Sequence, residues 1–323
     1  MNDLPSVTII IPTRPGQAEI AALTAARQLD YPRDRLQIIV ARGRQPAVQR
    51  NSALRAADGE LIYFLDDDSR PAKDNLRRAI SHFQNPAVTM VGGPNLCPPE
   101  APLLEQVFSV LLSSWLAFGP SRARYDNIGA MRESGEKELI LCNLMARKKE
   151  VLDLGGFDES LYPNEENALM DDLQKRGAKL IYDPEFMVHR RPRPTLKAFV
   201  KMLFTYGRGR AEQFRLHPTP GSALNLVPPL FCAYLLLLPI FTSILPPPFD
   251  WLIEAPVAAY FLAALIQTIA SMRRGFVKSM LALPLLVLTH ICYGIGFWRG
   301  LFTKVTRGQM SMPTEVVLEQ ISL

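Results

Sequence analysis

The sequence predicts an α/β fold with a parallel sheet, followed by a membrane part made of apolar helices. In the first half, short β-branched apolar segments alternate with helical segments, which is the pattern of βαβ units. In the second half, apolar segments are long enough to cross a bilayer. The mean hydropathy of +0.06 averages these unlike parts. We therefore expect a first domain at residues 1–215 and a membrane domain at residues 216–323.

Composition narrows the possible functions. The 323 residues include 36 Lys and Arg against 31 Asp and Glu, a net charge of +5, and basic side chains gather at residues 190–215. This distribution suits membrane lipids or a phosphorylated ligand, and we expect no nucleic acid partner. The four cysteines are widely spaced, which predicts neither a disulfide framework nor a thiolate metal site. No signal peptide is expected, so the first domain would be cytosolic.

Three strands and two helices are expected first. Residues 7–11, 36–40 and 61–65 are rich in β-branched, aromatic and other apolar residues, as strands buried on both faces are. Residues 19–29 predict a helix, and Pro46 opens another. The order βαβαβ implies right-handed crossovers and a parallel sheet whose carboxyl ends share one edge.

Three carboxylates follow the third strand, at Asp66, Asp67 and Asp68. Ser69 would cap a helix that begins there, with Pro71 in its first turn. Adjacent carboxylates repel one another unless water or a cation screens them, and the first and third can face one cavity. Hard oxygen ligands favour Mg²⁺ or Mn²⁺, which also bind phosphates. The alternative is a solvated acidic turn.

Other residues are expected at the same edge of the sheet. Thr13 and Arg14 follow the first strand, Arg42 follows the second, and Arg50 lies on the second helix. Arginines that face carboxylates and a metal can clamp a diphosphate. The alternative for Arg50 is an ordinary ion pair with a nearby acid. Gly93, after a fourth strand, permits close approach of the backbone to whatever occupies the site.

The middle of the chain predicts further elements. Strands are expected at residues 88–91, 139–145 and 179–182, and helices at residues 148–154 and 165–177. A turn at residues 155–159 separates the two helices. The apolar segment at residues 103–119 is either a core helix or a helix at a membrane interface.

The order and spacing of these motifs resemble the family 2 glycosyltransferases. The resemblance extends to about Arg215 and rests on Pro12-Thr13, a second strand that ends near Gly43, Gln49-Arg50-Asn51, Asp58-Gly59, Phe64-Leu65-Asp66-Asp67-Asp68, Gly155-Gly156-Phe157-Asp158-Glu159 and Glu165-Glu166-Asn167. It implies a Rossmann-like GT-A fold, inverting transfer from a nucleotide sugar, and a membrane-anchored bacterial enzyme. The family often has a nucleobase-binding aspartate after the second strand, where this chain has Val40-Ala41-Arg42-Gly43.

The resemblance also implies roles for residues. The donor would be bound by Pro12, Thr13, Arg14, Arg42, Arg50, Asn51, Asp66, Asp67, Gly93, Arg208 and Arg210. The last two match a Gln/Arg-x-x-Arg-Trp motif only in part, because the tryptophan is absent. Mn²⁺ or Mg²⁺ would be held by Asp68, Asp66 and His189; the alternative for the histidine is a structural role.

A catalytic base is expected later in the chain. A sugar hydroxyl is a poor nucleophile at neutral pH, so inverting transfer needs a base opposite the leaving diphosphate. The family has an acidic pair here, and its second member maps to Glu166, with Glu165 as the second choice. The alternative is that both acids only stabilise the start of a helix.

The membrane part begins with an amphipathic helix at residues 195–206, fit to lie on a membrane face. Three apolar segments follow, at residues 223–245, 251–272 and 278–298. Basic residues place both flanks of the first two in the cytosol. A third crossing would put Arg299 outside, against the same rule. The last segment is therefore re-entrant or interfacial, or divides in two, which gives two to four apolar segments in all.

Three functions remain open. The first is an inner-membrane glycosyltransferase that adds a sugar to a hydroxyl of a lipid-linked or envelope polysaccharide acceptor. The second is a polyprenyl-phosphate sugar synthase, whose anionic acceptor has less need of a base. The third is a membrane adaptor that retains a nucleotide-binding fold without catalysis.

Overall fold

The computed structural model describes residues 4–161, 164–216, 220–244, 250–303 and 315–322. These residues form two compact units, which are described separately. The first comprises residues 1–98, 120–191 and 306–323, and the second comprises residues 99–119 and 192–305. This division differs from the expected boundary at residue 215 at three places, because residues 99–119 and 192–215 group with the apolar helices and the C-terminal residues group with the sheet.

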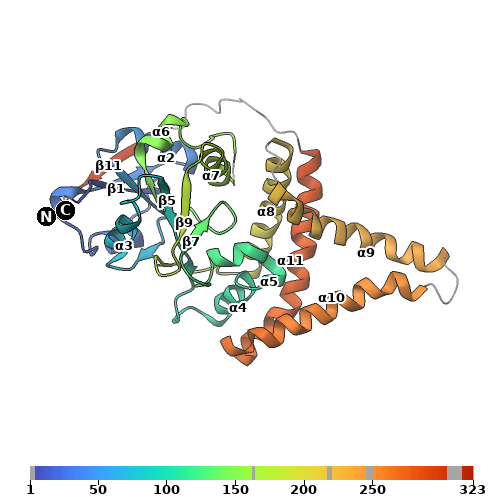
Figure 1. The fold of residues 1–323 in the computed structure, drawn as a ribbon. Coiled ribbons are helices and arrows are strands. Elements are labelled where there is room, and N and C mark those ends of the chain that lie inside the picture. The colour runs from blue at the N-terminus through green and yellow to red at the C-terminus, as the bar shows by residue number, and fades with distance from the viewer. Residues whose placement is uncertain (1–3, 162–163, 217–219, 245–249, 304–314, 323) are drawn as a thin grey trace. The chain divides into compact units, whose positions relative to one another are not determined.

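The first unit contains a mixed sheet of strands in the order β11-β2-β1-β3-β8-β5-β9-β7 (Figure 1). Its strands are β1 (Val7–Thr13), β2 (Leu36–Arg42), β3 (Leu61–Leu65), β5 (Val88–Gly92), β7 (Arg132–Ser134), β8 (Asn143–Arg147), β9 (Lys179–Tyr182) and β11 (Val317–Ile321). A second sheet has the order β4-β10-β6, formed by β4 (Arg70–Pro71), β10 (Val188–His189) and β6 (Asn95–Leu96).

Helices of the first unit connect these strands. They are α1 (Ala21–Ala26), α2 (Pro46–Ala56), α3 (Asn75–His82), α6 (Lys148–Asp153) and α7 (Glu165–Lys175), with short 3₁₀ helices η1 (Arg33–Arg35) and η2 (Gly119–Arg124), the latter at the boundary of the units. The expected βαβαβ order is confirmed, since β1 pairs in parallel with both β2 and β3.

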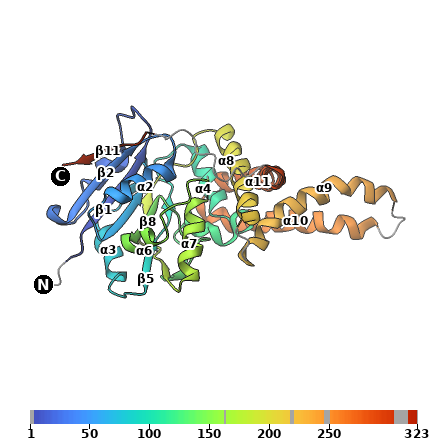
Figure 2. The same ribbon diagram turned by 90° about the horizontal axis from the view of Figure 1, so that it is seen from above.

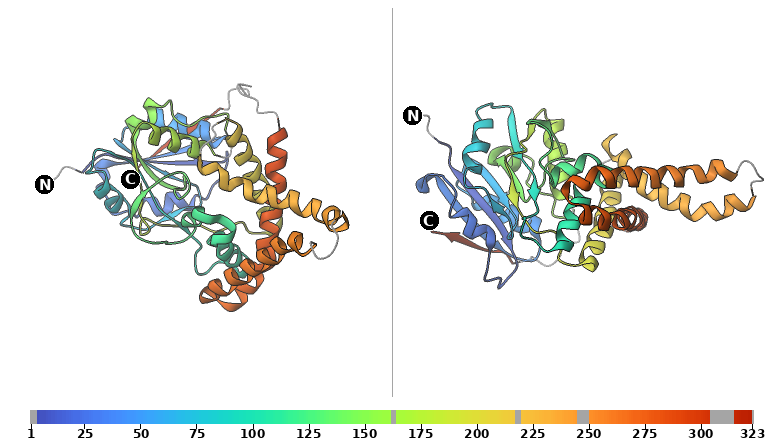
Figure 3. Two further views of the ribbon diagram at one scale, coloured as in Figure 1. Left: turned by 45° about the vertical axis from the view of Figure 1, so that its right-hand side comes forward. Right: turned by 90° about the horizontal axis from the view of Figure 1, so that it is seen from below.

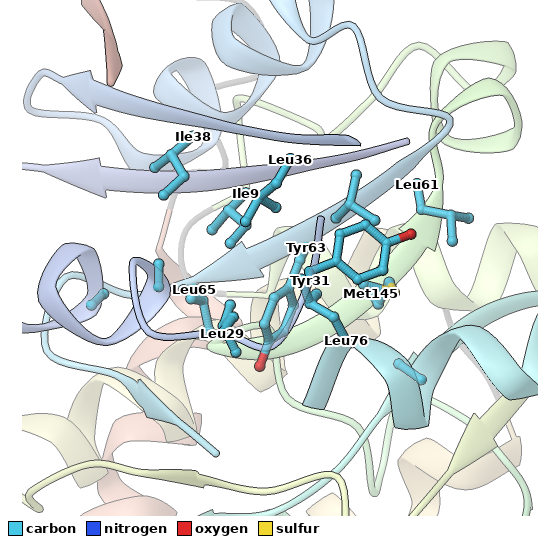
Figure 4. Packing of buried hydrophobic residues seen from close by; sticks show 14 of the residues in the cluster. Ile9, Leu29, Tyr31, Leu36, Ile38, Leu61, Tyr63, Leu65, Leu76 and Met145 are labelled. Atoms are coloured by element: carbon cyan, nitrogen blue, oxygen red, sulfur yellow. The ribbon is translucent and has the colours of Figure 1, made fainter. Parts of the chain in front are cut away.

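Alternation of side chains along the strands supplies two cores, one on each face of the sheet. Ile9, Tyr63 and Leu65 point to one face, where they pack with residues of α1 and α3 (Figure 4). Ile10 and Phe64 point to the other face, against residues of α2 and α7. Burial of each large apolar side chain stabilises the fold by about 1.5–3 kcal/mol. The sheet is thus fixed from both sides, and its strand ends are held in place.

Two sequence expectations about the first unit were wrong, and one strand was not expected. The strand expected at residues 139–145 begins only at Asn143 and is antiparallel to its neighbours. Ser69 caps no helix, because its hydroxyl donates to the Cys142 carbonyl, and Pro71 belongs to β4. The strand β11 was not expected at all; it pairs antiparallel to β2 at the sheet edge (Figure 2). Chain segments far apart in sequence supply these partners, so local patterns do not reveal them.

The second unit consists of helices. They are α4 (Leu103–Leu112), α5 (Trp115–Phe118), α8 (Leu196–Leu216), η3 (Pro220–Leu226), α9 (Val227–Ile244), α10 (Asp250–Ser271), η4 (Met272–Arg274) and α11 (Phe276–Phe302). The amphipathic helix expected at residues 195–206 is confirmed and continues to Leu216. The segment expected at 103–119 is broken into α4 and α5. Among the described residues, three helical stretches are long and apolar enough to cross a membrane: Ala223–Ile244, Trp251–Arg274 and Phe276–Phe302.

Candidate active site

The candidate site lies where β1, β2 and β3 end. In the parallel register Thr13 is opposite Arg42, and Ile10 is opposite Phe64. Asp66 therefore follows β3 at the same edge at which β1 and β2 end. Ligands of open α/β sheets bind at this carboxyl edge, so the fold brings the expected residues to a suitable place.

Arg50 connects the acidic strand end to the acidic start of α7. Its Nη2 donates to Asp66 Oδ1 at 2.9 Å, and its Nη1 donates to Glu165 Oε1 at 3.2 Å. The guanidinium is buried, with only 6% of its side chain exposed. Arg50 is thus the ion-pair partner named as the alternative, and the pair also brings the two expected acidic groups into one site.

Arg190 also binds the aspartates, through two ion pairs. It was not among the residues expected at the site. Its Nη1 donates to Asp66 Oδ2 at 2.9 Å, and its Nε donates to Asp68 Oδ1 at 2.5 Å. The residue follows β10, whose pairing with β4 and β6 places it beside the strand end. The basic segment at residues 190–193 was the only sequence signal, and it did not identify the partner.

The start of α7 is held in an unusual backbone conformation. Asn164 has φ 116°, the only positive value among described non-glycine residues, and such strain costs about 1–3 kcal/mol. Its side-chain oxygen accepts a bond from Asn167, which in turn accepts one from Arg124 at 2.7 Å. Its backbone N–H donates to Glu165. These bonds hold the start of α7, whose first residue is Glu165.

Glu165 and Glu166 differ in environment. Glu165 is buried and bound to Arg50, whereas Glu166 is partly exposed. Burial, followed by repulsion from Glu166, raises the pKa of Glu165 to about 7, although Arg50 lowers it. Burial also raises the pKa of Asp68; Arg190 opposes that rise, while Asp66 and Asp67 add to it. The more accessible carboxylate of the glutamate pair is therefore Glu166.

The expected metal ligands are only partly brought together. Asp66 and Asp68 share Arg190, but no group of three or more His, Cys, Asp and Glu side chains within the described ranges is placed to hold a metal ion. His189 lies on β10, paired with Arg70 and Leu96. Mg²⁺ often uses one or two carboxylates plus substrate phosphates, so the two aspartates fit such an ion. The ligand role of His189 stays a prediction.

Three other expected donor residues lie at the strand ends. Pro12 and Thr13 are buried at the end of β1, and Arg14 is exposed just beyond it. The Thr13 hydroxyl is buried and has no hydrogen-bond partner among the residues that the structure describes. A buried polar group without a partner costs free energy unless a ligand or water satisfies it. Thr13 thus agrees with a role in ligand binding.

Three expected donor residues have partners within the chain, and their role in donor binding stays a prediction. Arg42 binds Glu319 on β11 through Nε at 2.6 Å. Asn51 donates to the Phe157 carbonyl at 2.8 Å, so it fixes the turn before α7. A Cβ on Gly93 would lie 1.8 Å from the Phe186 carbonyl oxygen, so the close approach expected there is to the chain's own backbone. The sequence predicted these neighbourhoods but not these partners.

The two remaining expected donor residues lie on α8, in the second unit. Arg208 Nε is 3.5 Å from Glu212 Oε1, and Arg210 donates to Gln213 at 2.9 Å. Their role in donor binding stays a prediction.

Comparison with known proteins agrees with the expected family. Residues 17–128 match the family model described as glycosyl transferase family 2. The pre-mycofactocin glycosyltransferase of Mycobacterium tuberculosis is 26% identical over 203 residues, which cover 59% of this chain and 40% of that protein. The succinoglycan biosynthesis protein ExoA of Rhizobium meliloti is 29% identical over 192 residues, which cover 58% of this chain and 54% of that protein. The chain thus spans about half the length of these relatives or less.

A solved structure shows the same fold. The mannosyltransferase PcManGT from Pyrobaculum calidifontis, in complex with GDP-Man and Mn²⁺, has a TM-score of 0.54 at 16% identity. The likeness covers 93% of this chain and 88% of that chain. The expected GT-A fold is confirmed.

Proposed function

We propose that this chain contains a family 2 glycosyltransferase domain. On this premise, it moves a sugar from a nucleotide diphosphate sugar to a hydroxyl of a lipid-linked or envelope polysaccharide acceptor. The configuration at the anomeric carbon would be inverted. The observation that carries the proposal is the joining of two acidic groups through Arg50, one at the end of β3 and one at the start of α7.

The donor diphosphate would bind at the end of β3. Arg190 and Arg50 hold Asp66 from two sides, and guanidinium groups suit phosphate oxygens as well as carboxylates. Asp66 and Asp68 would hold Mn²⁺ or Mg²⁺, and the Mn²⁺ bound by PcManGT supports the choice of a divalent ion. When bound, such an ion neutralises charge on the departing diphosphate. The Thr13 hydroxyl would donate a hydrogen bond to the bound nucleotide sugar.

Glu166 would remove the proton of the acceptor hydroxyl as the bond between the sugar and the diphosphate breaks. It is partly exposed, whereas Glu165 is buried and bound to Arg50. Glu165 would position the pair, because its carboxylate connects α7 to Arg50 and hence to Asp66. A base on the side opposite the leaving group is what inversion requires.

The relatives and the apolar helices support the proposed acceptor class. One relative is a succinoglycan biosynthesis protein, and the described residues of this chain include three helices that are long and apolar enough to cross a membrane. An acceptor that carries a lipid or belongs to the envelope would be found at that membrane. The basic residues around the helices support a catalytic unit on the cytosolic side of the inner membrane.

A donor panel tests this function. The purified full chain is incubated with different nucleotide sugars, Mn²⁺ or Mg²⁺ and a lipid extract, and release of nucleoside diphosphate is measured. We expect one donor to be consumed and a glycosylated lipid or saccharide to form. Asp68→Ala and Glu166→Ala should each abolish product. Full biological function in both variants would instead identify a non-catalytic adaptor.

A further inference from the structure

The packing and the charges of the apolar helices indicate a membrane topology that their lengths alone do not indicate. We propose that the chain crosses the membrane twice, through a hairpin of α9 and α10, and that α11 lies at the membrane surface beside α8, on the same side as the catalytic unit and both chain ends. The proposal rests on membrane anchoring and not on sugar transfer.

Strand pairing requires an even number of crossings. Strand β8 pairs with β3 and β5, and β11 pairs with β2 in the same sheet. All strands of one sheet lie on one side of a membrane. The bent pair Leu103–Leu112 and Trp115–Arg124 therefore makes no net crossing. By the same argument, the segment between β9 and β11, which both belong to this sheet, crosses an even number of times, although it holds three helices of sufficient length.

A second, independent observation lies within the helical unit. Arg215, at the end of α8, donates through Nη1 to the Gly300 carbonyl at 3.1 Å and to the Thr303 carbonyl at 2.5 Å. The chain thus enters the three helices and leaves them at neighbouring points. An odd number of crossings would separate these points by the thickness of the bilayer, about 30 Å.

Burial identifies α11 as the helix that does not cross. In the apolar 18-residue stretch of α11, 44% of the residues are buried. The buried share is 6% in the corresponding stretch that contains α9 and 11% in the one that contains α10. A Cβ on Gly296 would lie 2.4 Å from the Phe204 carbonyl oxygen, and one on Gly300 would lie 2.4 Å from the Arg208 carbonyl oxygen. The backbones of α8 and α11 are therefore in direct contact, as Figures 1 and 2 show.

The sequence of α8 excludes it from the hydrocarbon region. Six ionisable side chains lie along its 21 residues: Lys197, Lys201, Arg208, Arg210, Glu212 and Arg215. Such side chains are expensive in the bilayer core. Because α11 packs along this helix, it lies at the same depth, which is the surface.

The free face of α11 suits that position. Val277, Leu281, Ile295 and Phe302 are exposed, and their spacings of 4, 14 and 7 residues place them on one side of a helix. An apolar stripe on a helix whose other side is packed against a charged helix can enter the boundary of the acyl chains without crossing it. By contrast, α9 and α10 run side by side as a hairpin (Figure 3). The rings of Phe231 on α9 and Tyr260 on α10 stack at 4.4 Å.

The distribution of lysine and arginine residues agrees with this membrane topology. The sequence has no lysine or arginine between Arg215 and Arg273, so the connection between α9 and α10 carries no positive charge. Both outer ends of the hairpin are basic and would remain in the cytosol. Arg299 then also stays on the cytosolic side, which removes the conflict that a third crossing would create.

Epitope tags in the full chain test the topology. One tag precedes Met1, one is inserted after residue 247, between α9 and α10, and one follows Leu323. Membranes are extracted with alkaline carbonate, and sealed vesicles of both orientations are treated with protease. We expect retention in the membrane, with the terminal tags on one side and the inserted tag on the other. Release by carbonate, terminal tags on opposite sides, or all three tags on one side would overturn the proposal.

A matched pair of substitutions tests the position of α11. Ile266 on α10 is 59% exposed and Ile295 on α11 is 48% exposed. Ile266→Arg should lower the fraction of chains with a translocated inserted tag about tenfold, whereas Ile295→Arg should change it less than about twofold. Equal losses would place α11 in the hydrocarbon and overturn the proposal. If the tags show the proposed topology but no nucleotide sugar is consumed, the proposed function is refuted and the topology stands.

Discussion

Arg50 and Glu165 form a buried ion pair, Nη1 to Oε1 at 3.2 Å, that joins α2 to the first residue of α7. The same guanidinium holds Asp66 at 2.9 Å. Asp66 and Glu165, about 100 residues apart in the sequence, thus depend on the guanidinium of Arg50 for their relative position.

Replacing Arg50 tests this dependence. Arg50→Lys keeps the charge, but a single ammonium lacks the planar fork that reaches two carboxylates. We expect kcat/KM to fall about 100-fold, the usual cost of a small misplacement at a reacting centre. Arg55→Lys is the control, because Arg55 lies on the same helix and its contact is with Ser52 at 3.4 Å. Equal activity in both variants would show that the bridge does not position the site.

The pKa of Glu165 predicts a stability that depends on pH. Burial raises this pKa to about 7 from 4.5, so the folded state holds a proton that the unfolded state has lost between these values. The contribution of Glu165 to the free energy of unfolding is therefore complete below about pH 4.5 and decreases as pH rises to about 7, by roughly 1–3 kcal/mol. Glu165→Gln should remove this decrease.

Thermal unfolding of both proteins between pH 4.5 and 8 measures the difference. The stability of the native protein relative to Glu165→Gln should decline across this interval and then remain constant. Glu133→Gln, which alters a side chain that is 57% exposed, serves as the control and should follow the native profile. A constant difference between the native protein and Glu165→Gln would contradict the raised pKa.

The turn before α7 allows Asn51 to be tested as a structural residue. Gly155 and Gly156 have nearly equal φ values of 87° and 85°, so alanine is strained to the same extent at both. A Cβ at Gly156 would lie 2.4 Å from Asn51 Oδ1, whereas nothing lies within 4 Å of one at Gly155. We expect Gly156→Ala to lower the free energy of unfolding by about 1–3 kcal/mol more than Gly155→Ala.

Chemical unfolding of the two variants in detergent gives this difference. If Asn51 instead served the donor, Gly156→Ala would raise the KM for the donor and leave the stability equal to that of Gly155→Ala.

The sequence predicts the part of this site that local patterns determine. An apolar strand followed by acid identifies the place of Asp66, and the βαβαβ order brings Arg50 to the same edge. Arg190 was missed because its position depends on β10 pairing with β4 and β6, which come from distant parts of the chain. The partner of Arg42 was missed for the same reason, since Glu319 lies 277 residues away.

The last prediction concerns Glu166 and separates the two enzymatic hypotheses. Glu166→Gln keeps the size of the side chain but removes the base, so transfer to a hydroxyl should fall about 1,000-fold while donor binding is unchanged. Asp172→Asn on the same helix is the control; its carboxylate binds Lys175 at 3.5 Å, and the variant should keep full activity. A phosphate acceptor is already anionic near pH 7 and needs no such base. Full transfer by Glu166→Gln to a polyprenyl phosphate, with none to hydroxyl acceptors in the native protein, would identify the synthase instead.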